Sequence, residues 1–174
     1  GGDHEFVSTS AKAVAETAIF QEDVTLRASL EGGALYSPNR DSRVSDRLFL
    51  DSRQMRGFEP YGLGPREYQA GGVQDDALGG TYFAVARFEA EFPFGLPEEY
   101  GRSGGVFYDV GSVWGLDQSS ANVIYEDMSL RHVVGFSIFW DTPIGPLRFN
   151  FSKAIKKEAL DQERNFDFTL SAIF

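Results

Sequence analysis

Cysteine is absent from the 174 residues of this chain, and histidine occurs only twice, as His4 and His132. The chain therefore forms no disulfide and no thiolate metal site, and two histidines without cysteine make a poor zinc site. No stretch of the sequence approaches the roughly 18 consecutive apolar residues of a transmembrane helix. A strand needs only about 9–11 residues to cross a bilayer, so this absence does not exclude a membrane protein.

Positive charge is scarce as well. The chain has 16 Lys and Arg against 26 Asp and Glu, a net charge of -10. This balance argues against nucleic acid or anionic lipid as a partner, because both attract clustered Lys and Arg. Phenylalanine, tyrosine and glycine are abundant instead, with 16, 7 and 19 residues. Aromatic residues favour strands and glycines suit turns and curved sheets, so the composition favours one all-β domain.

Alternation of apolar and polar residues predicts seven strands, since successive side chains of a strand point to opposite faces. Short turns alternate with longer polar loops, which predicts an antiparallel meander. Residues 37–80 lack the alternation and form too long a connection for an ordinary turn, so we expect a working loop there. Within it, residues 47–50 are expected to prolong or add to a strand. The expected strands are 6–20, 24–36, 82–94, 104–114, 128–140, 147–153 and 166–174.

The last strand shows the alternation most clearly. Phe166, Phe168, Leu170, Ala172 and Phe174 share one face, and polar residues occupy the other. In a soluble sandwich the apolar face would pack on a second sheet. In an outer-membrane barrel it would contact lipid, while the polar face lined a wet lumen.

Several motifs resemble the BamA family of outer-membrane barrel-assembly factors. That family's long loop carries V-R-G-F/Y, then a G-P pair, then G-G before the next strand; Met55 stands where valine is usual. The loop elements correspond here to Met55-Arg56-Gly57-Phe58, Leu63-Gly64-Pro65 and Leu78-Gly79-Gly80. Three further segments agree in order and spacing with other family features. Residues 84–89 resemble the family strand that bears a lumen glutamate, residues 107–114 resemble its F-x-D-x-G-x-V-W segment, and residues 140–149 resemble its penultimate hairpin.

The resemblance implies that residues 1–174 are the C-terminal segment of a sixteen-stranded outer-membrane β-barrel. It implies seven or eight strands, a lumen-directed loop at 37–80, and no POTRA domain in this chain. The function implied is folding and insertion of β-barrel client proteins by strand pairing at the barrel seam. The implied partners are outer-membrane lipid, unfolded clients and, in the full protein, the lipoproteins of the assembly machinery. Open strand edges also invite self-association.

The resemblance further implies a loop clamp, in which Arg56 pairs with Glu89 and Asp109 and is flanked by Gly57 and Phe58. Alternation independently places both acids on polar faces. A guanidinium holds carboxylates with several directed hydrogen bonds, whereas an exposed arginine would form only a weak surface pair. Glu91 is a third candidate acid on the same face. The seam residues are Phe166, Phe168, Leu170 and Phe174.

Other readings stay open. A translocation barrel of the same superfamily, TamA-like or of two-partner secretion, shares the loop arginine. A second alternative is a passive small outer-membrane barrel or adhesin. A third is a soluble glycan-binding or hydrolytic sandwich. Neither would have an insertase role. Glu89, Glu91 and Asp109 would then be candidates for glycosidase carboxylates, although acids are ordinary in a barrel lumen and Arg87 lies on the same face. We expect no enzymatic activity, no metal and no cofactor.

Overall fold

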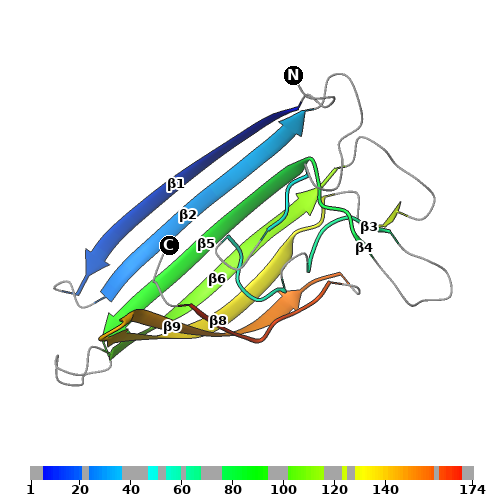
Figure 1. Ribbon diagram of the computed structural model, residues 1–174. Coiled ribbons are helices and arrows are strands. Elements are labelled where there is room, and N and C mark those ends of the chain that lie inside the picture. Colours follow the sequence, from blue (N-terminus) through cyan, green and yellow to red (C-terminus); the bar gives the residue numbers. More distant parts are fainter. Residues whose placement is uncertain are drawn as a thin grey trace.

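The computed structural model describes residues 6–20, 24–36, 47–50, 54–59, 62–67, 76–93, 102–115, 123–124, 128–158 and 161–169. Seven strands form one antiparallel sheet in the order β1-β2-β5-β6-β8-β9-β10, so each strand pairs with the next long strand of the chain. The sheet is open, and the predicted all-β antiparallel meander is confirmed (Figure 1). No helix in the described parts is long and apolar enough to cross a membrane. The strands are β1 (Val7–Ile19), β2 (Val24–Tyr36), β5 (Tyr82–Pro93), β6 (Arg102–Trp114), β8 (Arg131–Thr142), β9 (Gly145–Lys156) and β10 (Phe166–Thr169).

A second, small sheet was not predicted. It has the order β4-β3-β7 and joins parts of two long connections. Its strands are β3 (Arg66–Glu67), β4 (Asp76–Ala77) and β7 (Val123–Ile124). The expectation of a strand at 47–50 is wrong, because Leu48 forms only an isolated bridge to Gly80. Strands of two residues have no periodicity that alternation could detect.

The hairpin of β8 and β9 is longer than predicted. Pairing continues past Trp140 and Leu147 to Thr142 and Gly145, so the connection shrinks to a two-residue turn. Gly145 has a φ of 126°, a conformation that favours glycine. The backbone hydrogen bonds thus carry both strands beyond the segments that alternation marks.

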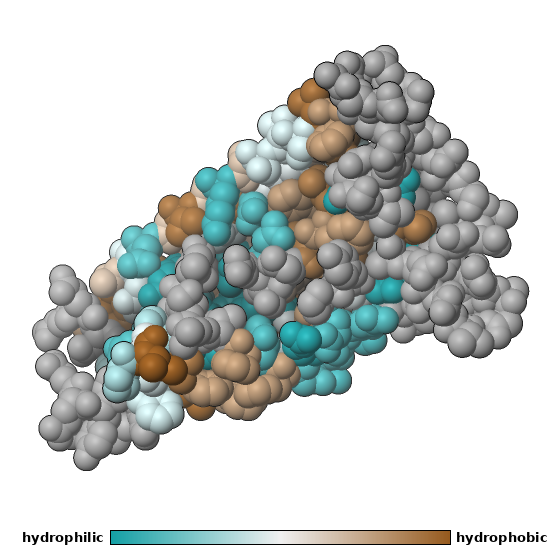
Figure 2. All heavy atoms as spheres, in the orientation of Figure 1, coloured by the Kyte–Doolittle hydropathy of each residue, from teal (hydrophilic) through white to brown (hydrophobic). Residues whose placement is uncertain are grey.

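The two faces of the large sheet differ in exposure. The inner face is the one that carries Glu89 and Asp109, and the outer face is the opposite one. Leu30, Phe136 and Phe168 lie on the outer face and are 63%, 51% and 59% exposed. Figure 2 shows the molecule from the side on which the described loop pieces lie, with hydrophobic and hydrophilic residues mixed over this view. Side chains of the outer face are thus among the large apolar side chains that the described residues leave exposed.

The buried core lies between the inner face and the long loop. The loop and the strands each contribute apolar side chains to one cluster. In Figure 1 the described loop pieces, coloured cyan to green, lie against one side of the sheet. This packing fixes the loop over the strands that carry the candidate site. The cluster consists of Leu50, Met55, Phe58 and Leu63 from the loop, and Phe83, Val85, Phe107, Val113 and Val133 from β5, β6 and β8.

Candidate functional site

Arg56 is a residue of the long loop and is 2% exposed. Its Nε and Nη2 donate to Oδ2 and Oδ1 of Asp109 at 2.8 and 2.6 Å, and its backbone N–H donates to Oδ2 at 3.0 Å. Its Nη1 donates to Oε2 of Glu89 at 3.2 Å. The guanidinium also lies 3.8 Å from the ring centroid of Phe107. One loop residue is thus joined to two strands by charged hydrogen bonds, which are stronger than neutral ones.

The two acids come from neighbouring strands of the sheet. Glu89 of β5 pairs with Phe107 of β6, and Asp109 of β6 pairs with Arg87 of β5. These four side chains share the inner face because side chains alternate along each strand. Both carboxyl groups have side chains with no exposed surface. The sheet register therefore places two buried acids where one loop arginine reaches both.

Two further arginines complete this buried group. Arg148 of β9 donates from Nη2 to Oε1 of Glu89 at 2.7 Å and from Nε to Oδ1 of Asn150 at 2.9 Å. Nε of Arg87 lies 3.9 Å from Oδ2 of Asp109. Each carboxylate thus faces more than one guanidinium, which offsets the cost of burying the charges. The sequence patterns pointed to Arg87 but not to Arg148, although Arg148 occupies a polar position between Leu147 and Phe149 in the alternation of the strand.

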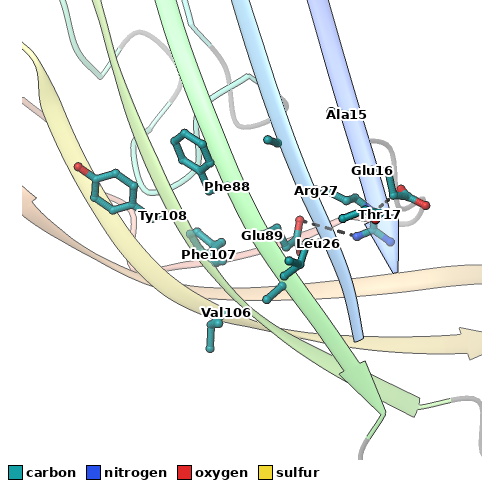
Figure 3. Close-up of a pocket in the computed structure, with 12 residues that line it drawn as sticks. Ala15, Glu16, Thr17, Leu26, Arg27, Phe88, Glu89, Val106, Phe107 and Tyr108 are labelled. Carbon is teal, nitrogen blue, oxygen red and sulfur yellow. Dashed lines mark hydrogen bonds and ion pairs between the residues drawn. The ribbon is translucent and has the colours of Figure 1, made fainter. Parts of the chain in front are cut away.

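Glu91 belongs to a neighbouring group of charges, centred on Arg27 and not on Arg56. It is bonded to Arg27 of β2, and its Oε1 accepts a hydrogen bond from Ser103 at 3.1 Å. Arg27 also donates to Glu16 of β1 at 2.9 Å and lies 4.0 Å from Glu89. Figure 3 shows Arg27 reaching toward Glu16 and Glu89 from the strand between them. A chain of ion pairs therefore crosses the inner face from β1 to β5.

Gly57 and Phe58 follow Arg56 in a part of the loop that lies close to β8. Gly57 has a φ of 96°, and a Cβ at this position would lie 2.7 Å from Cγ1 of Val133. Phe58 is 3% exposed and packs in the apolar core. Only glycine adopts this backbone conformation so close to β8 without strain. The structure thus brings Arg56, Gly57, Phe58, Glu89 and Asp109 into one region.

The terminal-strand residues lie elsewhere. Phe166 and Phe168 stand on the outer face, where their rings stack with Phe149 at centroid distances of 6.4 and 6.3 Å. Leu170 and Phe174 lie outside the described residues. The predicted seam residues that are described therefore form an aromatic row on the face opposite the Arg56 group.

A second buried ion pair was missed entirely. Arg131, at the start of β8, donates from Nε and Nη2 to Asp161 at 2.8 and 3.3 Å, and neither side chain is exposed. Nη1 of Arg131 donates to Ser112 Oγ at 3.0 Å and to the carbonyl of Ser129 at 2.7 Å. Asp161 lies in an irregular connection, where alternation assigns no face. Only the three-dimensional packing identifies this pair.

The carboxyl group of Glu163, which follows Asp161 in the same connection, has a lowered pKa. Partial burial alone would raise the pKa of Glu163, but hydrogen bonds from the N–H of Ala154 and the amide of Asn165, together with nearby lysines, lower it. In the described parts of the chain, no group of three or more His, Cys, Asp or Glu side chains is arranged to hold a metal ion. The buried acids are instead engaged by arginines. Such an arrangement holds segments of chain together.

Comparisons with known proteins agree with this architecture. The family described as the Omp85 superfamily domain matches residues 1–174. The outer membrane protein assembly factor BamA of Neorickettsia risticii is 31% identical over 175 residues, which cover 100% of this chain and 23% of that protein. The BamA of Neisseria meningitidis serogroup B is 29% identical over 140 residues, which cover 69% of this chain and 17% of that protein.

A solved structure has the same fold. The crystal structure of BamA from Haemophilus ducreyi lacking POTRA domains 1-3 has a TM-score of 0.83 and covers 97% of this chain and 35% of that chain. Its sequence identity is 22%, so this likeness concerns the fold. The chain spans 23% and 17% of the two relatives above, about a fifth of their length.

The family match covers every residue, and the relatives are outer-membrane proteins by name. The sheet has the open antiparallel form and the apolar outer face that a segment of a membrane barrel requires. We therefore place the chain in the bacterial outer membrane. By its sequence and its fold, it belongs to the Omp85 superfamily.

Proposed function

We propose that this chain is the C-terminal barrel segment of a BamA-like assembly factor, which folds and inserts β-barrel client proteins into the outer membrane. Residues 37–80 form its lumen-directed loop. The observation that carries the proposal is the burial of Arg56 against Glu89 and Asp109 in a chain of the Omp85 superfamily. The names of its relatives, which are assembly factors, support the same activity.

The loop clamp gives the barrel a defined interior. Ordering a long loop costs conformational entropy, roughly 1–2 kcal/mol for each residue fixed. The hydrogen bonds of Arg56 and the apolar contacts of Met55 and Phe58 offset part of that cost. The clamp thereby holds the loop against β5, β6 and β8, and it sets the shape of the wall next to the last strands.

The last strand supplies the site for clients. Among the described residues, β10 pairs with β9 and lies at one end of the strand order. An edge strand presents unpaired N–H and C=O groups, and an added strand gains affinity from backbone hydrogen bonds. We propose that clients pair at the seam between this strand and the first strand of the full barrel. Lipoproteins of the assembly machinery and outer-membrane lipid are the other proposed partners.

The test uses the full-length protein with Arg56→Ala. We expect a several-fold loss of folded client barrels in the outer membrane, because the loop loses its charged anchor. Lys12→Ala removes an exposed cation of β1 and serves as the matched control, with client folding unchanged. Client folding is followed by heat-modifiable mobility on gels, at equal amounts of the factor itself.

The same experiment separates the competing functions. Normal client folding with Arg56→Ala, at normal protein levels, would contradict the proposed role of the clamp. If clients fold normally but export of a secreted protein is lost, the chain is a translocation barrel instead.

A further inference from the structure

The lead segment, residues 161–165, runs directly into β10 and lies against the long loop. The N–H of Glu59 donates to the carbonyl of Gln162 at 2.9 Å, and the N–H of Gln162 donates to the carbonyl of Gly62 at 2.7 Å. The N–H of Arg164 donates to the carbonyl of Gly57 at 2.8 Å. The loop residues next to Arg56 are thus hydrogen-bonded, backbone to backbone, to the residues that begin the last strand.

The lead segment is also fixed from the barrel wall. Asp161 receives two hydrogen bonds from Arg131 of β8, and its Oδ2 accepts a third from the N–H of Glu158 at 2.9 Å. The side chains of Arg131 and Asp161 have no exposed surface. A bidentate arginine–carboxylate contact restricts the relative orientation of the two side chains as well as their distance. This pair therefore anchors one end of the lead segment as Arg56 anchors the loop.

The anchored lead segment runs into β10, whose register decides which side chains face outward. Phe166 pairs with Phe151, and Phe168 pairs with Phe149, so both aromatics stand on the outer face while Asp167 faces inward. A slip of one residue would turn the aromatics inward and Asp167 outward. Four described residues of β10 pair with β9 in this register.

We propose that Arg131 and Asp161 are positioning residues that set the register of the last strand. The buried pair fixes the lead segment on β8, and the loop backbone holds its other residues. Phe166 consequently enters the sheet opposite Phe151. The effect of this register on clients rests on the proposed function. Only in this register does the edge of β10 present the correct hydrogen-bonding groups to a client strand.

Arg131 and Arg56 thereby act on one structure from two sides. Arg56 joins the loop to β5 and β6, and Arg131 joins the lead segment to β8. The loop and the lead segment are bonded to each other at Gly57 and Arg164. The position of the long loop is therefore coupled to the start of the last strand.

The register can be read by disulfide cross-linking in a cysteine-free full-length protein. Residues directly opposite in an antiparallel pair lie close enough for a disulfide. The in-register pair is Phe149→Cys with Phe168→Cys, and the off-register pair is Phe149→Cys with Thr169→Cys. Each pair is placed in the parent and in Arg131→Ala, in the milder Asp161→Asn, and in Lys153→Ala as the control. The side chain of Lys153 in β9 is 73% exposed, and its Nζ lies 3.7 Å from Oε1 of Glu163 in the lead segment.

We expect the in-register cross-link to fall several-fold in Arg131→Ala and in Asp161→Asn, with a matching rise of the off-register product. Combining both substitutions should add little, because the two residues form one contact. Lys153→Ala should cross-link like the parent. Unchanged in-register yield in both Arg131→Ala and Asp161→Asn would overturn the inference, as would an equal loss in Lys153→Ala.

Client folding, measured in variants without the cysteines, separates this inference from the proposed function. If cross-linking shifts as expected but no variant, Arg56→Ala included, affects client folding, the register role stands and the assembly function fails. If client folding is lost in Asp161→Asn with no change in cross-linking, the assembly function stands and the register role is overturned.

Discussion

The strands β1 and β6 have 13 residues each and both carry an acid on the inner face, yet their surroundings differ. Nearly every described residue of β1 is exposed, on both faces, whereas the inner face of β6 is buried. Glu16 of β1 has a side chain that is 58% exposed, and Asp109 of β6 has none exposed. The long loop packs on β5, β6 and β8, and its described residues leave β1 uncovered. Alternation creates a polar face, but the loop decides which part of it becomes a buried site.

The largest loss of stability is expected in β6, which the long loop covers. Asp109→Ala leaves the guanidinium of Arg56 buried without its main partner, because two of its three hydrogen bonds go to Asp109, as does that of the Arg56 backbone N–H. Breaking a buried pair costs about 3–5 kcal/mol of the free energy of unfolding. Urea titration of the full-length protein in lipid vesicles measures this loss, and proteolysis of the loop reports its release.

Glu16→Ala is the counterpart at the uncovered end. Its ion pair with Arg27 is exposed on the Glu16 side, so the free energy of unfolding should fall by less than about 1 kcal/mol. Equal losses for Glu16→Ala and Asp109→Ala would contradict the view that the loop distinguishes the two ends of the sheet.

The outer face provides a second contrast, set by depth in the bilayer. Phe136 lies in the middle of β8 and is 51% exposed, and Ile144 lies in the turn after β8 and is 77% exposed. Phe136→Arg should destabilise the full-length protein by about 2–4 kcal/mol, as a cation does near the bilayer midplane. Ile144→Arg, close to the interface, should cost about 0–1 kcal/mol. The same titration in vesicles measures both, and similar costs at the two positions would argue against lipid on the outer face.

These contrasts also explain which features could be read from the sequence. The long strands were predicted because alternation is local and needs no knowledge of partners. The hairpin ends were less accurate, since pairing across β8 and β9 extends both strands. The small sheet β4-β3-β7 was missed because each of its strands has two residues.

The site divides along the same line. Arg56 is separated from Glu89 and Asp109 by 33 and 53 residues, so only the family motif suggested that they meet. Alternation did place both acids on polar faces. Asp161 lies in an irregular segment and matched no motif, so its pairing with Arg131 left no signal in the sequence. Long-range ion pairs of loops depend on how the loop folds back, and local patterns contain little information about that.

An effect smaller than those at Asp109 and Phe136 tests how closely the loop must approach the wall. Gly57→Ala introduces a Cβ at a φ of 96° and 2.7 Å from Cγ1 of Val133. Backbone strain of this kind costs about 1–3 kcal/mol. Val133→Ala removes the close methyl groups but leaves the backbone strain, and it costs stability itself because Val133 is buried in the core. The double variant should therefore lose less than the sum of the two single losses. Urea titration of the two single variants and the double variant separates these contributions. If the losses of unfolding free energy are fully additive, the new Cβ does not contact Val133, and the cost of Gly57→Ala comes from its backbone conformation alone. A combined loss smaller than the sum would assign part of that cost to the contact with β8.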